Sequence, residues 1–220
     1  ELRRVQNSLP NVNIKSAILP MDIQKYHEAE NIVNQAIALF GKIDILVNNA
    51  GISQRSLAID TPFMDDLRII EIDLIGTIAF TKALLPHLMS HSDTQIVVIS
   101  SVMGKINTKY RTSYAAAKHG VVGYFESLRL ELAGKVDVCN IMPGFIATNI
   151  VKNAVSKEFN PNNQNAKGMT PDVFAQKALN AIYNKQKNVY IGGIKEQFAM
   201  VLKRLSPKIF DWFIKDIKVV

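Results

Sequence analysis

Residues 95–123, QIVVISSVMGKINTKYRTSYAAAKHGVVG, decide the fold of this chain. The run IVVIS near the start of this stretch is apolar and mostly β-branched, which is typical of a short strand buried on both faces. The second half, beginning at TSYAAAKHG, predicts a helix. The strand therefore carries Ser101 to one rim of a cleft. The helix carries Tyr114 and Lys118, which lie four residues apart and so share one face.

These three side chains suit proton transfer to or from an alcohol or carbonyl oxygen. A free tyrosine titrates near pH ~10, so using a phenol near neutrality requires roughly 4 kcal/mol of stabilisation of the phenolate. An ammonium group at about 4 Å supplies about 1 kcal/mol through water, but about 4 kcal/mol at an effective dielectric constant of about 20. We therefore expect Lys118 to act on Tyr114 in a partly closed site, and Ser101 to donate a hydrogen bond to the substrate oxygen.

A tyrosine and a lysine four residues apart are, by themselves, more often an ordinary pair on a helix surface. Here a serine at a strand end lies 13 residues upstream of the tyrosine, and only alanines separate the pair, so a flat ligand could approach it. The whole pattern resembles the short-chain dehydrogenase/reductase family, on the residues Asn48-Asn49-Ala50-Gly51, Ser101, Tyr114-Ala-Ala-Ala-Lys118 and Pro143-Gly144-x-x-x-Thr148.

The resemblance covers nearly all of the chain and implies an oxidoreductase that transfers a hydride between a nicotinamide cofactor and an alcohol or ketone. It implies that Tyr114 exchanges the proton, Lys118 also holds the nicotinamide ribose, and Ser101 fixes the substrate oxygen. The implied cofactor is NADP or NAD, with NADP slightly favoured, although the deciding residues would end a second strand that this sequence lacks. The implied cofactor contacts are Asp22, Asn49, Ala50, Gly51, Tyr114, Lys118, Ile146 and Thr148.

Simpler interpretations exist for several of these residues. Asn49 to Gly51 would serve equally as a plain turn, Asp22 as a helix start, and Thr148 as a helix cap. Asp73 departs from the family pattern, which usually has Asn there. We expect its negative charge to oppose that of Lys118 in stabilising a phenolate and so to slow catalysis.

A dinucleotide site normally contains a glycine-rich turn between the first strand and the first helix, and this sequence has none. Family members carry that turn in an N-terminal strand-helix-strand unit, and this chain resembles the portion that follows it. In the family's strand order 3-2-1-4-5-6-7, the places between the predicted strand at Asn13 to Leu19 and the strand at Ile43 to Val47 belong to the first two strands. Without those two strands both places would be empty, and apolar strand edges would be exposed. We therefore expect that this chain is a fragment of a longer gene product or comes from an incomplete gene model. An N-terminal half that is fused or supplied as a separate chain is a less favoured alternative.

Strands alternate with helices along the rest of the chain. This order predicts an α/β fold with a doubly wound, mostly parallel, Rossmann-like sheet that lacks the first strand-helix-strand unit. Ligands of such folds bind beyond the carboxyl ends of the strands, so Asn48, Ser101 and Pro143 should gather at one edge. Predicted strands cover 43–47, 96–100, 136–142 and 188–191, and predicted helices cover 1–9, 24–40, 62–90, 112–133 and a stretch from 171.

Composition narrows the class of protein. The 220 residues suit a single, N-terminally incomplete domain, and 48% hydrophobic with 20% charged residues is typical of a water-soluble α/β protein. The formal charge of +7 is spread along the chain without a nucleic-acid motif, so no nucleic-acid partner is predicted. The single Cys139 excludes an internal disulfide and is expected to be a buried, inert thiol. His87 and His91 lack a third ligand nearby, so no metal site is predicted.

Two segments bear on the substrate and on partners. Residues 145–168 are interpreted as a mobile substrate loop, suggesting an apolar alcohol or carbonyl substrate such as a steroid, retinoid or lipid. Residues 194–220 form an amphipathic, basic tail broken at Pro207, which resembles the member 7 branch of the family. A lid, a subunit contact in a homo-oligomer and an interfacial membrane helix are its candidate roles, and packing on the protein itself is preferred.

No apolar run approaches the roughly 18 residues of a membrane span, and no signal peptide is visible. We expect a cytoplasmic protein, or one associated with the endoplasmic reticulum membrane if a longer N-terminus exists. Two functions from other classes stay open: a catalytically idle cofactor-fold protein used for binding or assembly, and a peripheral membrane protein that uses its basic tail.

Overall fold

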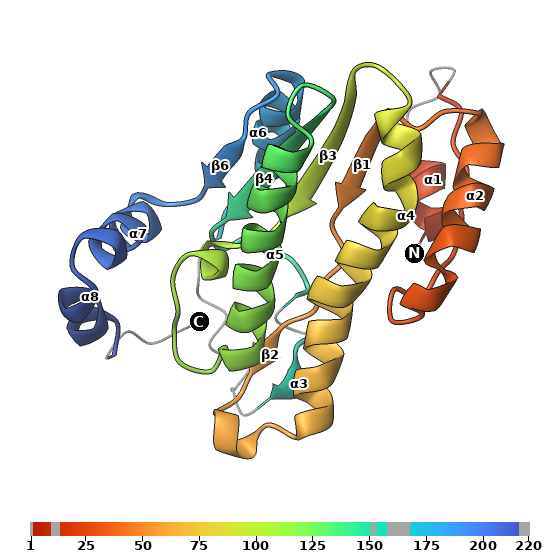
Figure 1. The fold of residues 1–220 in the computed structure, drawn as a ribbon. Coiled ribbons are helices and arrows are strands. Elements are labelled where there is room, and N and C mark those ends of the chain that lie inside the picture. Colours follow the sequence, from red (N-terminus) through yellow and green to blue (C-terminus); the bar gives the residue numbers. More distant parts are fainter. Residues whose placement is uncertain (1, 10–13, 151–152, 158–167, 216–220) are drawn as a thin grey trace.

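A computed structural model describes residues 2–9, 14–150, 153–157 and 168–215, and shows a parallel sheet between layers of helices (Figure 1). The predicted α/β, Rossmann-like fold is confirmed. The strand order is β1-β3-β4-β6, and every neighbouring pair is parallel. The strands are β1 (Ile45–Asn48), β3 (Thr94–Ile99), β4 (Val136–Pro143) and β6 (Asn188–Ile191), with β2 (Gln54–Arg55) and β5 (Val155–Lys157) paired in a second small sheet.

The helices occur close to where the sequence predicts them. Gly41 ends α2 with a left-handed φ of 79°, and its N–H donates to Ile37 O at 2.7 Å. Thr170 caps α6 by accepting a hydrogen bond from Val173 N at 3.4 Å. The helices are α1 (Leu2–Ser8), α2 (Ala29–Phe40), α3 (Phe63–Ile70), α4 (Thr77–Met89), α5 (Thr112–Glu131), α6 (Pro171–Tyr183), α7 (Ile194–Leu205) and α8 (Pro207–Ile214), with a π-helical turn at Glu71–Gly76 and 3-10 turns at Tyr26–Glu28, Ala58–Asp60 and Val102–Gly104.

The central strands are buried on both faces. Ile96 and Val98 of β3 belong to the core formed with α2, α4 and α5, whereas Val97 packs toward α6 on the opposite face. Cys139 of β4 also lies on the α6 face and is fully buried, as predicted. Burial raises the pKa of this thiol to about 11, which keeps it protonated near neutral pH.

The predicted strand over residues 13–19 is wrong for residues 14–19, which form no helix or strand. Residue 13 lies outside the described residues. A strand needs a neighbour for its ladder hydrogen bonds, and β1 pairs only with β3 within the described chain. Segment 14–19 is instead held by Gln6, which donates to Ser16 O at 3.2 Å. The predicted apolar edge of the sheet is present, because Ile45 and Val47 of β1 are 45% and 49% exposed.

The predicted mobile loop, residues 145–168, contains the strand β5, and Ile146 forms a parallel bridge with Met169. Its residues 151–152 and 158–167 lie outside the described residues. The tail breaks before Pro207 as predicted, and Phe210 of α8 packs in a cluster that includes Val102 and Ile106.

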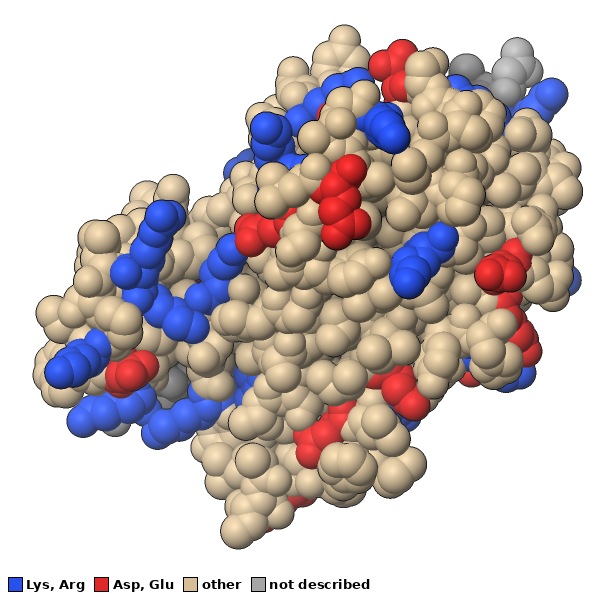
Figure 2. Space-filling model, in the orientation of Figure 1, with Lys and Arg blue, Asp and Glu red and all other residues tan. Residues whose placement is uncertain are grey.

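Charge on the visible face of the molecule is uneven. Lys and Arg gather over α7 and α8 in Figure 2. In the described part of the chain, none of the helices combines the length and apolar character that crossing a bilayer would need.

Phe125 of α5 is fully buried in the core between α2, α4, α5 and the sheet. We expect Phe125→Ala to reduce the free energy of unfolding by about 3–5 kcal/mol, because it leaves a cavity among close-packed side chains. Phe63, which is 74% exposed, is the matched control, and Phe63→Ala should change the free energy of unfolding by less than about 0.5 kcal/mol. Urea denaturation measures both, and equal losses would contradict this description of the core.

Candidate active site

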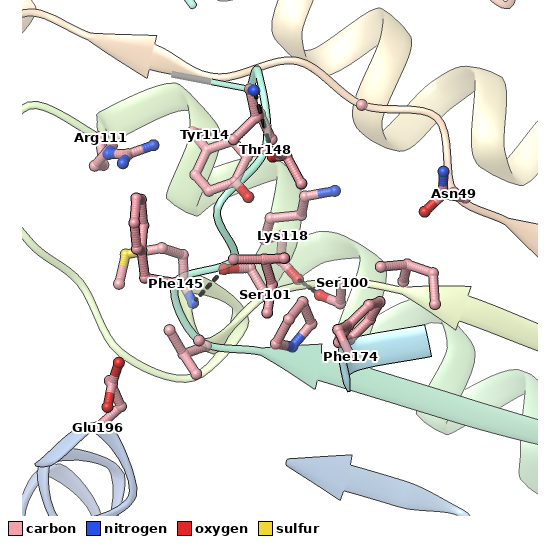
Figure 3. Close-up of a pocket in the computed structure, with 18 of the residues that line it drawn as sticks. Asn49, Ser100, Ser101, Arg111, Tyr114, Lys118, Phe145, Thr148, Phe174 and Glu196 are labelled. Atoms are coloured by element: carbon pink, nitrogen blue, oxygen red, sulfur yellow. Dashed lines mark hydrogen bonds between the residues drawn. The ribbon is translucent and has the colours of Figure 1, made fainter. Parts of the chain in front are cut away.

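A cavity of about 490 Å³ opens beyond the carboxyl ends of the parallel strands. Asn49 follows β1, Ser101 follows β3 and Pro143 ends β4, and all three line it, together with Tyr114 and Lys118 from α5. Figure 3 shows the Tyr114 phenol and the Lys118 ammonium above Ser101 in this space. The structure therefore brings the predicted trio to one cavity at the predicted edge of the sheet.

Ser101 is buried at the start of the 3-10 turn Val102–Gly104. Its Oγ accepts a hydrogen bond from Met103 N at 3.1 Å. A hydroxyl that accepts from the backbone keeps its own proton to donate. This geometry suits Ser101 to donate to an oxygen atom placed in the cavity.

Tyr114 and Lys118 lie one turn apart on α5, and both are buried. The Lys118 Nζ atom is 5.6 Å from the centre of the Tyr114 ring. Burial acts to lower the pKa of Lys118, but the neighbouring Asp73 and Tyr114 together outweigh burial and raise it. Lys118 is therefore held as an ammonium group beside the phenol.

Asp73 is the ion-pair partner of Lys118, with Oδ2 3.1 Å from Nζ. Its Oδ1 accepts a hydrogen bond from Ile52 N at 2.8 Å. Burial raises the pKa of Asp73 and exceeds the opposing effect of the Lys118 charge. The sequence predicts that Asp73 opposes Lys118, and the structure shows the direct contact through which it can do so.

Gly51 is where the turn after β1 meets this ion pair. A methyl group on Gly51 would lie 3.1 Å from Asp73 Oδ2 and 3.3 Å from Lys118 Nζ. Those distances are shorter than ordinary van der Waals contact for carbon. A methyl group at this position would therefore force the ion pair to shift by a few tenths of an ångström.

The remaining predicted cofactor residues fall into two groups. Asn49, Gly51, Ile146 and Thr148 line the cavity with Lys118. Ala50 belongs to the same turn but does not line the cavity. Asp22 is exposed and also lies outside the lining, where its carboxylate accepts a hydrogen bond from Gln24 N at 3.0 Å. The structure thus gives Asp22 the local helix-start contact and leaves its contact with the cofactor a prediction.

Sequence reasoning missed several residues of the cavity wall. Arg55 and Arg111 line it, as do Phe145, Phe174 and Glu196. The spacing of Arg111, three residues before Tyr114, is a signal that could have placed it on the same side of α5. Arg55 gives no such signal, because its position depends on pairing between β2 and β5.

Comparisons with known proteins identify the family that this chain resembles. The short chain dehydrogenase family matches residues 1–159. Dehydrogenase/reductase SDR family member 7B of Xenopus tropicalis is 35% identical over 96% of this chain and 72% of its own length. Dehydrogenase/reductase SDR family member 7 of Homo sapiens is 36% identical over 87% of this chain and 59% of its own length.

Solved structures show the same fold. A short-chain dehydrogenase from Streptomyces avermitilis gives a TM-score of 0.76 at 23% identity, covering 89% of this chain and 78% of that one. A short-chain dehydrogenase from Burkholderia cenocepacia, solved in complex with NADP, gives a TM-score of 0.74 at 20% identity, covering 89% of this chain and 77% of that one. The chain belongs to the short-chain dehydrogenase family, whose members are typically NAD(P)-dependent oxidoreductases.

Gly51→Ala tests the packing around the ion pair. We expect the added methyl group to push Asp73 and Lys118 apart and to lower the free energy of unfolding by about 1–3 kcal/mol. Gly123 of α5 is the matched control, because a methyl group there meets nothing within 4 Å. Gly123→Ala should stabilise the protein by up to about 1 kcal/mol. A Gly51→Ala protein that unfolds at the wild-type urea concentration would show that the ion pair is not tightly enclosed.

Proposed function

We propose that this protein transfers a hydride between a nicotinamide cofactor and an alcohol or ketone, with Tyr114 as the acid or base. The observation that carries the proposal is the convergence of Ser101, Tyr114 and Lys118 on one cavity, with the ammonium group buried beside the phenol. The family membership supports the same reaction class.

The residues present fit the nicotinamide end of such a cofactor. The cavity lining includes the carboxamide of Asn49, the Lys118 ammonium, the Thr148 hydroxyl and the apolar Ile146. Thr148 Oγ1 accepts a long hydrogen bond, 3.4 Å from Ile150 N, which leaves the hydroxyl proton to be donated to a ligand. These groups would hold the ribose and carboxamide of NADP or NAD, with NADP slightly favoured. When bound, the nicotinamide supplies or accepts the hydride.

Side chains of this protein perform the other steps of the reaction. Ser101 donates its hydroxyl proton to the substrate oxygen and so holds that oxygen against the Tyr114 phenol. In the reducing direction Tyr114 gives its proton to this oxygen, and in the oxidising direction the phenolate takes the proton back. Lys118 stabilises the phenolate, and Asp73 reduces that effect because it balances the ammonium charge.

The Tyr114→Phe variant tests the assignment of the acid. We expect it to reduce turnover of carbonyl compounds by at least about 100-fold, because a phenyl ring cannot carry the proton. Tyr183, which is 87% exposed on α6, is the matched control, and Tyr183→Phe should keep wild-type turnover. NADPH fluorescence should still detect cofactor binding by Tyr114→Phe. Undiminished turnover would overturn the assignment, whereas cofactor binding without any turnover in the wild type would favour a binding or assembly protein.

The Asp73→Asn variant tests how the ion pair affects the reaction. Removing the carboxylate leaves the Lys118 charge unbalanced, which favours the phenolate. The rising limb of the rate of alcohol oxidation against pH should therefore move to lower pH. Asp93→Asn is the control, since Asp93 is exposed and pairs with Lys185. If the rising limb of Asp73→Asn stays at the wild-type pH, or if turnover of this variant falls at fixed pH, the carboxylate assists catalysis.

A further inference from the structure

Helix α7 carries apolar side chains on the face that points away from the protein. On its packed side, Ala199 is only 5% exposed and Met200 packs in the same cluster. Four exposed apolar residues follow one another at intervals of four, three and four positions, and they are Ile194, Phe198, Val201 and Leu205. At about 100° per residue, this spacing holds them within about 60° of arc, opposite Ala199 and Met200. We call these four residues the outer stripe.

Helix α8 adds a second exposed apolar face. Its Phe210 is 2% exposed and packs inward, in the same cluster as Ala199 of α7. Ile209, Trp212 and Phe213, three and four positions apart, are 55%, 70% and 44% exposed. The two helices lie at one end of the molecule, beyond β6 (Figure 1). Single exposed apolar residues are ordinary, but a cluster of this kind marks an interaction surface.

Positive charge borders the outer stripe. Lys195 and Arg204 are exposed and lie on α7 about a quarter turn to either side of the stripe. Lys208 and Lys215 are exposed on and directly after α8. The segment 194–215 holds five basic and two acidic residues, and one of the acids, Glu196, lines the cavity instead. The gathering of Lys and Arg over both helices in Figure 2 therefore surrounds an apolar surface with net positive charge.

This combination of charge and apolar area fits the surface of an anionic bilayer. Acidic lipid headgroups attract Lys and Arg, and the acyl chains beneath accept apolar side chains. Trp212 suits the boundary between the two, where tryptophan is enriched. Helix α7 has 12 residues, fewer than the roughly 20 that cross a bilayer, so it would lie along the surface. A second copy of the chain fits less well, because a two-fold contact would set the same positive charges against one another.

We propose that α7 and α8 bind the surface of an anionic phospholipid bilayer. The outer stripe and Trp212 enter the boundary of the acyl chains, and Lys195 and Arg204 lie among the headgroups. The packed side of α7 carries Glu196, which lines the cavity, so the helix stands between the bilayer and the candidate active site. The proposal does not depend on the oxidoreductase reaction, and it brings the cavity close to lipid.

Trp212 provides the first measurement, because it is the single tryptophan of the chain and its fluorescence reports on this surface alone. We expect vesicles that mix phosphatidylserine with phosphatidylcholine to move its emission to shorter wavelength, and bromine-labelled acyl chains to quench it, since the indole leaves water. Vesicles of phosphatidylcholine alone should bind at least about tenfold more weakly, because they lack the anionic headgroups.

The double variant Phe198→Ser/Leu205→Ser should bind the mixed vesicles at least about tenfold more weakly, because two apolar side chains of the outer stripe are lost. The matched control is Phe63→Ser/Leu130→Ser, which also replaces one phenylalanine and one leucine. These two residues are 74% and 79% exposed on α3 and α5, and the control should bind as the wild type does. Far-ultraviolet circular dichroism checks that both variants keep the helix content of the wild type.

The double variant Lys195→Gln/Arg204→Gln tests the charge. It should bind the mixed vesicles at least about tenfold more weakly and leave binding to phosphatidylcholine unchanged. Wild-type binding by this variant to the mixed vesicles would overturn the assignment of an anionic bilayer.

Two other outcomes would overturn the membrane surface as a whole. One is an emission of Trp212 that the mixed vesicles leave unchanged, or an equal loss of affinity in the two serine variants. The other is an emission that moves with protein concentration and to which vesicles add nothing. If sedimentation then gives a dimer that Phe198→Ser/Leu205→Ser dissociates, a second copy covers this face.

Discussion

The buried ion pair between Lys118 and Asp73 is the interaction on which the site depends. Removing two charged groups from water costs several kcal/mol for each, and their attraction offsets that cost only when the geometry is good and the remaining polar atoms are bonded. The geometry is good here, because the groups are 3.1 Å apart, and Asp73 Oδ1 also accepts a hydrogen bond from Ile52 N. The pair thereby joins α5 to the turn that follows β1.

The π-helical turn Glu71–Gly76 carries Asp73, so the backbone of this turn sets the position of the carboxylate. Such turns insert an extra residue into a helix and are frequent at functional sites. Gly76 ends this one in a crowded place, since a methyl group there would meet Ile23 at 2.6 Å. Beyond it, Thr81 accepts a hydrogen bond from Asn48 at 2.9 Å, which ties α4 to the end of β1. The residue that holds the lysine and the strand that leads to the cavity are thus positioned by the same helix.

Much of the fold and site follows from local sequence patterns, and the rest from long-range contacts. Ser101, Tyr114 and Lys118 could be placed because a strand end and a four-residue helix spacing fix their directions. Residues 14–19 carry a strand-like pattern but form no strand, because pairing depends on neighbours far along the chain. Arg55 was missed for the same reason. Its burial follows from β2 pairing with β5 and from Gln54 bonding to Ser113.

The cavity wall holds its positive charges in two different settings. Lys118 is matched by Asp73, whose protonation burial favours, so the field at Tyr114 responds to the state of one carboxylate. Arg55 and Arg111 line the same cavity, and Arg55 remains charged near neutral pH. Proton transfer at Tyr114 can therefore depend on pH through Asp73 while the charge of Arg55 stays constant, even though Tyr114 and both arginines line a single cavity.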